Sequence, residues 1–236
     1  MAIGTPTLIL NDITVRATNV STAGTTSTAT TGSLIFCSIA GQTQGTVTTL
    51  IDSGGNTYTF AARSNAFHDI EHWYCLNAKQ LPSGGTFKAT TSAGGGYFLR
   101  GVAFVSGATG GYNTSASAST SGATTLTMTT SALAVAEEVA FASVNWNSFT
   151  TFVVDTTDGW TNMITTAQNG PFAYNVRSTT AAVVWKPSWT PSQSLDCLVT
   201  TFKTSNLTTT VTSASSAAGS ATFGPSIGIG LIGAGT

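Results

Sequence analysis

Residues 33–40 read SLIFCSIA, and residues 138–145 read EVAFASVN. Each is a short run of β-branched, aromatic and small apolar residues, a composition typical of a buried strand. Similar runs, such as TVTTLID (46–52) and FLRGVAFV (98–105), recur between clusters of Gly, Asn, Asp and Ser. Many short strands at this spacing predict an all-β fold, an antiparallel β-sandwich of the jelly-roll or Ig-like kind with extended terminal arms. Only residues 131–144 have a helix-like composition, and their second half fits a buried strand equally well.

A faint internal repeat connects the two halves of the chain. The two runs quoted above form one matching pair, and IDSGGNTYTF (51–60) resembles VDTTDGWTNM (154–163), which aligns Asp52 with Asp155. Such a repeat is expected either from two stacked modules or from one sandwich whose halves contribute similar strands.

The chain is expected to form one sandwich domain over residues 15–204, because neither half ends in a clear linker. Its weak pseudo-repeats would cover about 15–110 and 125–204, after an N-terminal arm of residues 1–14. The stretch GATGGYNTSASASTSGATT (107–125) is a candidate linker or a long sandwich loop.

Residues 205–236 are small, uncharged and low in complexity. We expect them to be a C-terminal assembly arm that packs on a neighbouring subunit or along a trimer axis. In an extended chain alternate residues share a side, so Ile227, Ile229 and Leu231 would supply one apolar face. The alternative is an additional strand of the chain's own sandwich.

The composition excludes several partners. Charged residues make up 7% of the 236 residues and the net charge is −1, whereas about 25% is usual. There is therefore no basic face for nucleic acid and no polybasic patch for a membrane surface. No apolar run approaches the ~20 residues of a membrane helix, and MAIGTPTLIL has no signal-peptide pattern. A hydroxyl-rich surface without a signal fits a virion protein that is assembled in a host cytoplasm and released by lysis.

The stretch FHDIEHWYC (67–75) contains both histidines of the chain and is the strongest candidate for a metal or catalytic site. On a helix, His68 and His72 would face together, but the pattern is not HExxH and the surroundings favour a strand. On a strand the two imidazoles lie too far apart to chelate one ion. The stretch is therefore interpreted as a structural strand, with metal binding or a ligand-contacting surface as alternatives.

Other candidate catalytic residues are weakly indicated. Glu137 and Glu138 are adjacent, so on a strand they point to opposite faces, and a distant carboxylate pair such as Glu71 with Asp155 is the remaining route to a glycosidase. No Ser or Cys nucleophile is paired with a base in any recognisable motif.

The three cysteines, Cys37, Cys75 and Cys197, are an odd number, which argues against a closed disulfide framework. Buried free thiols are expected. A single disulfide, for which Cys75 and Cys197 could approach across the sandwich, is the alternative.

Two loops and a group of tryptophans complete the candidates. The loops DSGGN (52–56) and DTTDG (155–159) have Ca²⁺-ligand chemistry but equally fit Asx turns. Trp160, Trp185 and Trp189 are candidate glycan or interface contacts, because exposed indole rings stack on sugars, and core packing is the alternative.

The order of these segments resembles a recurrent β-sandwich module of tailed-phage virion proteins and bacterial surface proteins. The resemblance rests on the D-x-x-G-N-x-Y turn at 52–58, on a strand carrying Trp73 and Tyr74, and on a late strand ending in Phe202 and Lys203. It implies a jelly-roll or Ig-like sandwich used for display, adhesion or capsid attachment, and it brings no catalytic residues.

The expected function is that of a structural protein of a tailed-bacteriophage virion, most simply a capsid decoration or cement protein. It would bind capsid or tail proteins and its own copies, as a homotrimer. The alternative is a tail-fibre, receptor-binding or adhesin module that binds a host surface glycan. No enzymatic activity, cofactor, metal, nucleic-acid partner or membrane insertion is expected.

Overall fold

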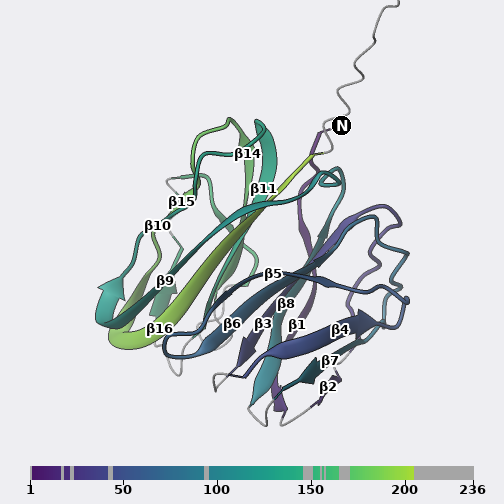
Figure 1. The fold of residues 1–236 in the computed structure, drawn as a ribbon, viewed down its shortest axis with the longest axis horizontal. Helices are drawn as coiled ribbons and strands as arrows, with labels where there is room; N and C mark the ends of the chain where they lie inside the picture. Colours follow the sequence, from purple (N-terminus) through teal and green to yellow (C-terminus); the bar gives the residue numbers. More distant parts are fainter. Residues whose placement is uncertain are drawn as a thin grey trace, which may run out of the picture. The chain divides into compact units, whose positions relative to one another are not determined.

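The computed structural model describes residues 2–16, 19–21, 24–41, 45–92, 96–145, 151–154, 156, 158–164 and 171–204. Every helix-or-strand element in these ranges is a β-strand, and all strand pairs are antiparallel (Figure 1). The all-β, antiparallel fold class predicted from the sequence is confirmed. The described part of the chain contains no helix that is long and apolar enough to cross a membrane.

The first half of the chain forms what we call the N-terminal module. It has a five-stranded sheet in the order β1-β8-β3-β6-β5 and a three-stranded sheet in the order β2-β7-β4. Its strands are β1 (Thr7–Arg16), β2 (Asn19–Ser21), β3 (Leu34–Gly41), β4 (Val47–Asp52), β5 (Thr59–Ser64), β6 (Asp69–Cys75), β7 (Phe87–Thr91) and β8 (Tyr97–Val105).

The second half forms the C-terminal module. Its large sheet has the order β9-β16-β11-β14-β13, with β12 also on β16, and its small sheet pairs β10 with β15. Its strands are β9 (Gly111–Thr125), β10 (Met128–Thr129), β11 (Glu137–Asn145), β12 (Thr151–Val153), β13 (Thr161–Asn162), β14 (Phe172–Ser178), β15 (Val184–Trp185) and β16 (Ser188–Lys203).

The two modules repeat one strand order. Within the N-terminal module the pairs nest, β1 with β8, β2 with β7 and β3 with β6. The C-terminal module repeats this nesting as β9 with β16, β10 with β15 and β11 with β14. SLIFCSIA forms most of β3, and EVAFASVN forms most of β11. The two strands correspond, because β3 lies between β8 and β6 in its sheet and β11 lies between β16 and β14.

Each module has its own apolar core between its large and small sheets. Side chains such as Ile35, Leu50 and Phe87 fill the first core, and Ala140, Trp185 and Cys197 belong to the second. Strands β3 and β11 are buried at all or nearly all positions, because they have a core on one face and the other module on the opposite face.

A third apolar cluster joins the two large sheets. Phe36 on β3 stacks on Phe141 on β11, with ring centroids 4.3 Å apart and an interplanar angle of 6°. Phe172 and Phe202 pack around this pair. Phe36 lies opposite Tyr74 in its sheet, and Phe141 lies opposite Tyr174, so the stacked rings occupy equivalent positions of the repeat. The modules therefore meet through equivalent faces.

The strand map differs from the sequence-based expectation at two places. Residues 107–125 were expected as a linker or loop, but Gly111–Thr125 is strand β9, paired along β16. Residues 1–14 were expected as an arm, but β1 begins at Thr7 and pairs with β8. The Ser and Ala residues that alternate in the middle of β9 have no strong strand signal alone, and pairing with a neighbouring strand decides their conformation.

Candidate functional site

Strand β6 carries the conspicuous polar stretch of the sequence, and its side chains alternate between two environments. Trp73 packs in the core of the N-terminal module, whereas Tyr74 packs on the cluster between the modules. His72 is fully buried and points at the C-terminal module. His72 and Tyr74 therefore face the other module, and Trp73 between them faces the core of its own module, as the alternation of a strand predicts.

His72 is held by hydroxyl groups of the C-terminal module. Its Nε2 lies 2.5 Å from the Ser143 hydroxyl, and its Nδ1 lies 3.0 Å from the Thr200 hydroxyl. Ser38 donates a hydrogen bond of 2.8 Å to Ser143. A neutral imidazole satisfies this set, because one ring nitrogen accepts and the other donates. Burial lowers the pKa of His72 to about 3, so the ring stays uncharged near neutral pH.

Asn145, at the end of β11, reaches across to the backbone of the N-terminal module. Its Nδ2 donates to the carbonyl oxygens of Gly41 (2.7 Å) and Asp69 (2.6 Å). Its Oδ1 accepts a hydrogen bond of 3.2 Å from the Arg100 guanidinium. Arg100 is fully buried, and burial lowers the pKa of its guanidinium to about 9.

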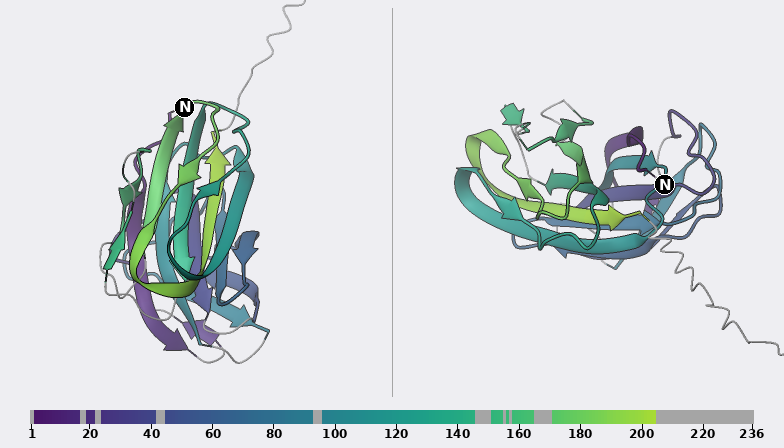
Figure 2. Two further views of the ribbon diagram at one scale, coloured as in Figure 1. Left: turned by 90° about the vertical axis from the view of Figure 1, so that its left-hand side faces the viewer. Right: turned by 90° about the horizontal axis from the view of Figure 1, so that it is seen from above.

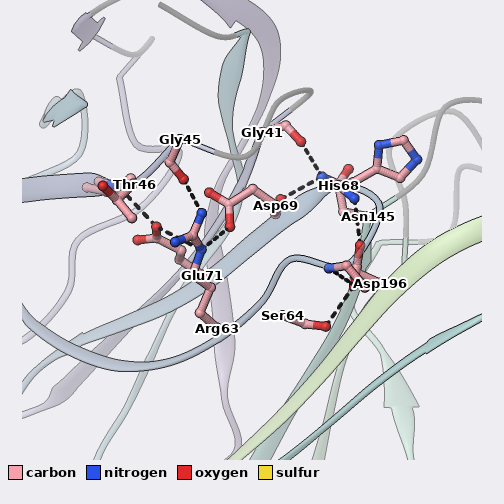
Figure 3. Close-up of polar contacts among 12 residues, drawn as sticks. Gly41, Gly45, Thr46, Arg63, Ser64, His68, Asp69, Glu71, Asn145 and Asp196 are labelled. Atoms are coloured by element: carbon pink, nitrogen blue, oxygen red, sulfur yellow. Dashed lines mark hydrogen bonds and ion pairs between the residues drawn. The ribbon is translucent and has the colours of Figure 1, made fainter. Parts of the chain in front are cut away.

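Asp196 on β16 accepts five hydrogen bonds. The donors are the hydroxyls of Ser64 (2.9 Å) and Ser119 and the backbone N–H groups of Ala66 (3.0 Å), Phe67 (2.9 Å) and His68 (2.6 Å). Figure 3 shows Asp196 facing this loop, with the His68 ring pointing away. Burial would raise the pKa of Asp196, but the hydrogen bonds from Ser119 and the three N–H groups outweigh it and hold the pKa below its ordinary value. The carboxylate thus clamps the 64–68 loop of one module to the other.

We call the side chains of Ser38, His72, Arg100, Ser143, Asn145, Asp196 and Thr200 the polar seam. They come from β3, β6 and β8 of the N-terminal module and β11 and β16 of the C-terminal module. Each of these residues is at most 2% exposed to solvent. Buried polar groups of this kind stabilise a fold only when they are hydrogen-bonded, and the partners here lie mostly across the module boundary.

Beside the polar seam, Arg63 lies between two buried carboxylates on β6 (Figure 3). Its Nε is 2.5 Å from Asp69 Oδ1 and 3.7 Å from Glu71 Oε1, and its Nη2 donates to the Gly45 carbonyl. Burial raises the pKa of Asp69 to about 7, although Arg63 opposes the shift. Burial also raises the pKa of Glu71, against the hydrogen bonds from Trp73 and the Val47 N–H group.

The geometry does not assemble a metal site from the candidate residues. Both ring nitrogens of His72 are hydrogen-bonded to hydroxyls, and the His68 ring points away from Asp196. Among the residues that the structure describes, no group of three or more His, Cys, Asp or Glu side chains is placed to hold a metal ion.

The loop at Asp52 is a hydrogen-bonded turn. The Asp52 carboxylate accepts hydrogen bonds from the Asn56 N–H group (3.0 Å), the Asn56 side-chain amide (2.9 Å) and the Tyr58 hydroxyl (2.7 Å). Gly55 adopts a φ of 76°, which glycine tolerates without strain. These contacts give the D-x-x-G-N-x-Y pattern a structural explanation, and they occupy the carboxylate that a Ca²⁺ ion would need. Asp155, the corresponding acid of the second loop, lies outside the described residues.

The three candidate tryptophans lie in the core of the C-terminal module. Trp160, Trp185 and Trp189 are 2%, 0% and 3% exposed, and Trp160 and Trp185 pack on each other with ring centroids 5.7 Å apart. No ring of the three offers a face on which a sugar could stack. The adhesin alternative required such a face and has no support from these residues.

Cysteines and the remaining acids have structural positions. Cys37, Cys75 and Cys197 are free thiols. Cys37 and Cys197 are buried, as expected, whereas Cys75 is only partly buried. Cys75 packs on the first core and Cys197 lies in the second, so the alternative of a disulfide between them is not found. Glu137 is exposed and Glu138 buried, on opposite faces of β11, and Glu138 accepts a 2.8 Å hydrogen bond from Asn113. The proposed apolar face of Ile227, Ile229 and Leu231 lies outside the described residues.

Sequence reasoning missed most of the polar seam. Arg100 and Asp196 interrupt the apolar runs FLRGVAFV and LDCLVTTFK. Charged residues are almost never fully buried unless they are paired, so a charge inside such a run is the signal that could have found them. No comparable signal marks Asn145.

The described part of the chain also has a shallow pocket of about 240 Å³, lined by Ile51, Asp52, Ser53, Thr86, Phe87 and Lys88. It lies away from the polar seam, at β4 and β7. Comparisons of the chain with protein-family models, with curated proteins and with solved structures found no match.

Proposed function

We propose that this chain is a structural protein of a tailed-bacteriophage virion, a capsid decoration or cement protein that acts by protein–protein binding as a homo-oligomer. The observation that carries the proposal is the use of the conspicuous polar residues. His72, Asn145 and Asp196 hold two sandwich modules together. Polar groups committed to internal contacts favour a rigid building block over a catalyst.

We further infer that each module is a jelly roll. In a jelly roll one long antiparallel hairpin is rolled up, so that the first strand pairs with the last and the inner strands pair in turn. The nested pairs of both modules fit this order, and the bridge between Ile51 and Thr57 connects β4 to the segment that leads into β5. Jelly rolls are common in viral capsid proteins and lectins, which supports a display or capsid role.

The surface composition also supports a structural role. With 7% charged residues and a net charge of −1, copies of the chain repel each other little, and hydroxyl groups solvate the exposed strands. Such a surface suits close packing of many subunits, whereas long-range steering of a charged substrate needs a strong field. Because one fold serves many functions, location is the property to measure.

The test is immunogold electron microscopy of phage particles from the source of the sequence, with an antibody raised against the folded chain. Gold over the head is the expected result. Antibody that has been absorbed with the purified chain is the control, and it should remove the label. Gold confined to the tail tip or fibres would replace decoration with receptor binding. Particles that never label, with an antibody shown to bind the native chain, would overturn the virion assignment.

A further inference from the structure

Strand β9 is a long sheet edge without charged residues or proline, and the middle of its ladder with β16 has no bulge. It spans 15 residues, Gly111–Thr125, and among the described residues it pairs only with β16. Its sequence, GYNTSASASTSGATT, has no charged residue and no proline. Natural proteins protect such edges with charges, proline, bulges or short strands, because a row of free backbone N–H and C=O groups is a template for another strand.

The equivalent strand of the N-terminal module makes the contrast clear. β1 has 10 residues, including an acid and an arginine. Both ladders contain three irregularities, but those of β1 interrupt its pairing with β8 along its length, whereas those of β9 leave the six residues Ser115–Thr120 regular. The opposite edges are short: β5 has 6 residues, including Arg63, and β13 has 2. Among the described edge strands, β9 is therefore the longest, and it has neither a charged residue nor a proline.

The middle of β9 is regular and accessible. Its pairing with β16 is uninterrupted from Ser115 to Thr120, and the irregularities lie on either side of this segment. Ser117, at its centre, is exposed. β5 approaches β9 through the contact of the Ser64 and Ser119 hydroxyls, 3.3 Å apart, and forms no ladder with it. Figure 2 shows the teal β9 following the yellow-green β16 along its length.

We propose that the outer edge of β9 binds a second copy of this chain, which adds its own β9 in antiparallel orientation about a two-fold axis near Ser117. Uncharged small side chains on both copies remove like-charge repulsion and let the backbones approach. A strand of 15 residues is about 50 Å long at ~3.4 Å per residue. If the sheet edge is ~10 Å thick, as the ~10 Å spacing of packed sheets indicates, pairing along the whole strand would bury on the order of 1,000 Å² in total, the lower limit for a specific contact.

The proposal rests on the self-association included in the proposed function, but not on the virion location. Gold labelling tests the location, whereas the edge contact is tested on purified protein, so the two failures are distinguishable. A two-fold contact pairs one patch with itself and closes at two copies. It therefore predicts a dimer, not the trimer expected from the sequence.

The experiment compares the full-length chain with Ser117→Lys and Ser117→Thr in sedimentation equilibrium. The wild type and S117T should be dimers, because threonine keeps the strand and adds no charge. S117K should raise the dissociation constant at least tenfold, because it sets two ammonium groups close together across the new ladder. Circular dichroism and thermal melting of S117K must match the wild type, so that loss of folding is not mistaken for dissociation.

Hydrogen exchange followed by mass spectrometry identifies the surface. Amides of residues 111–125 should become more protected as the concentration of wild type rises, and S117K should lose that gain. A dimer that S117K leaves intact would overturn the proposal, as would trimers or open-ended aggregates as the wild-type species. A monomer whose β9 amides are protected at every concentration would also overturn it and would assign the edge to a segment of the same chain.

Discussion

Replacement of His72 by phenylalanine should remove a defined part of the acid sensitivity of this protein. His72 is fully buried between the modules, with its ring nitrogens on the hydroxyls of Ser143 and Thr200. Phe172 is its counterpart, because Phe172 lies opposite Ser143 as His72 lies opposite Ser38. His72→Phe therefore gives the N-terminal module the same side chain that Phe172 provides at the equivalent position of the C-terminal module.

The size of the effect follows from the pKa of His72. An exposed imidazole has a pKa of about 6.5, and burial lowers that of His72 to about 3. Below about pH 6.5 the unfolded chain therefore binds a proton that the folded chain does not bind until about pH 3. Stability from neutral His72 is present above about pH 6.5 and is lost as the pH falls. Between about pH 7 and pH 5 the linked loss is about 2 kcal/mol.

Urea denaturation at these two pH values measures the difference. From pH 7 to pH 5, the free energy of unfolding of the wild type should fall relative to that of His72→Phe by about 2 kcal/mol. Other titrating groups are common to both proteins and cancel in the comparison. His72→Phe should also be less stable at neutral pH by about 1–3 kcal/mol, because the hydroxyls of Ser143 and Thr200 lose a partner.

Thr200→Val is the matched control. It removes one hydrogen bond to the imidazole but keeps the ring buried, so it should lower the stability at both pH values and keep the wild-type pH dependence. If wild type and His72→Phe showed the same pH dependence, the imidazole would not be held neutral in the folded protein, and the reasoning on the polar seam would fail.

Three further predictions concern the contacts between and beside the modules. Asp196→Ala leaves the donors of the 64–68 loop without their acceptor and should lower the free energy of unfolding by about 3 kcal/mol or more. Ser119→Ala removes one donor and should lower it by about 1 kcal/mol. Equal effects of the two variants in chemical denaturation would contradict the proposed clamp. Phe141→Ala opens a cavity beside Phe36 and should cost about 3–5 kcal/mol, and a loss below about 1 kcal/mol would show that the modules do not depend on this stack. Asp69→Asn should change the pH dependence of the free energy of unfolding in the opposite direction to His72→Phe. The pKa of Asp69 is raised to about 7, so its protonated carboxyl adds stability at low pH. That stability is lost as the pH rises from about 4 through 7. In urea titrations Asp69→Asn should lack that loss, and an unchanged profile would contradict the burial of this acid.

The fold class was predictable from local pattern. Runs such as SLIFCSIA and EVAFASVN combine β-branched and aromatic residues with turn residues on both sides, and nearly every such run is a strand. The faint repeat was also visible, because β3 and β11 occupy equivalent positions and need similar side chains. Strand β9 was not predictable: its Ser, Ala and Thr residues have no pattern that distinguishes a strand from a linker, and its conformation is decided by the ladder with β16.

The candidate site was predictable only in part. The stretch FHDIEHWYC stood out by its polarity, and the alternation of a strand placed His72 and Tyr74 on one face. The hydrogen-bond partners of His72, Ser143 and Thr200, lie 71 and 128 residues further along the chain. Nothing local in the sequence indicates such contacts, because they depend on how two large sheets face each other.

The sequence by itself determined that this is an antiparallel β protein with low charge, an internal repeat and an Asp52 turn, because these properties depend on composition and on residues close together in the chain. Only the tertiary structure decided that the two modules meet through equivalent faces, that His72 and Asp196 join them, and that the candidate tryptophans lie in a core. The physical reason is that burial and hydrogen-bond partners are set by contacts distant in sequence. The same polar side chain can be a ligand, a surface group or an internal clamp, and only the packing around it selects among these roles.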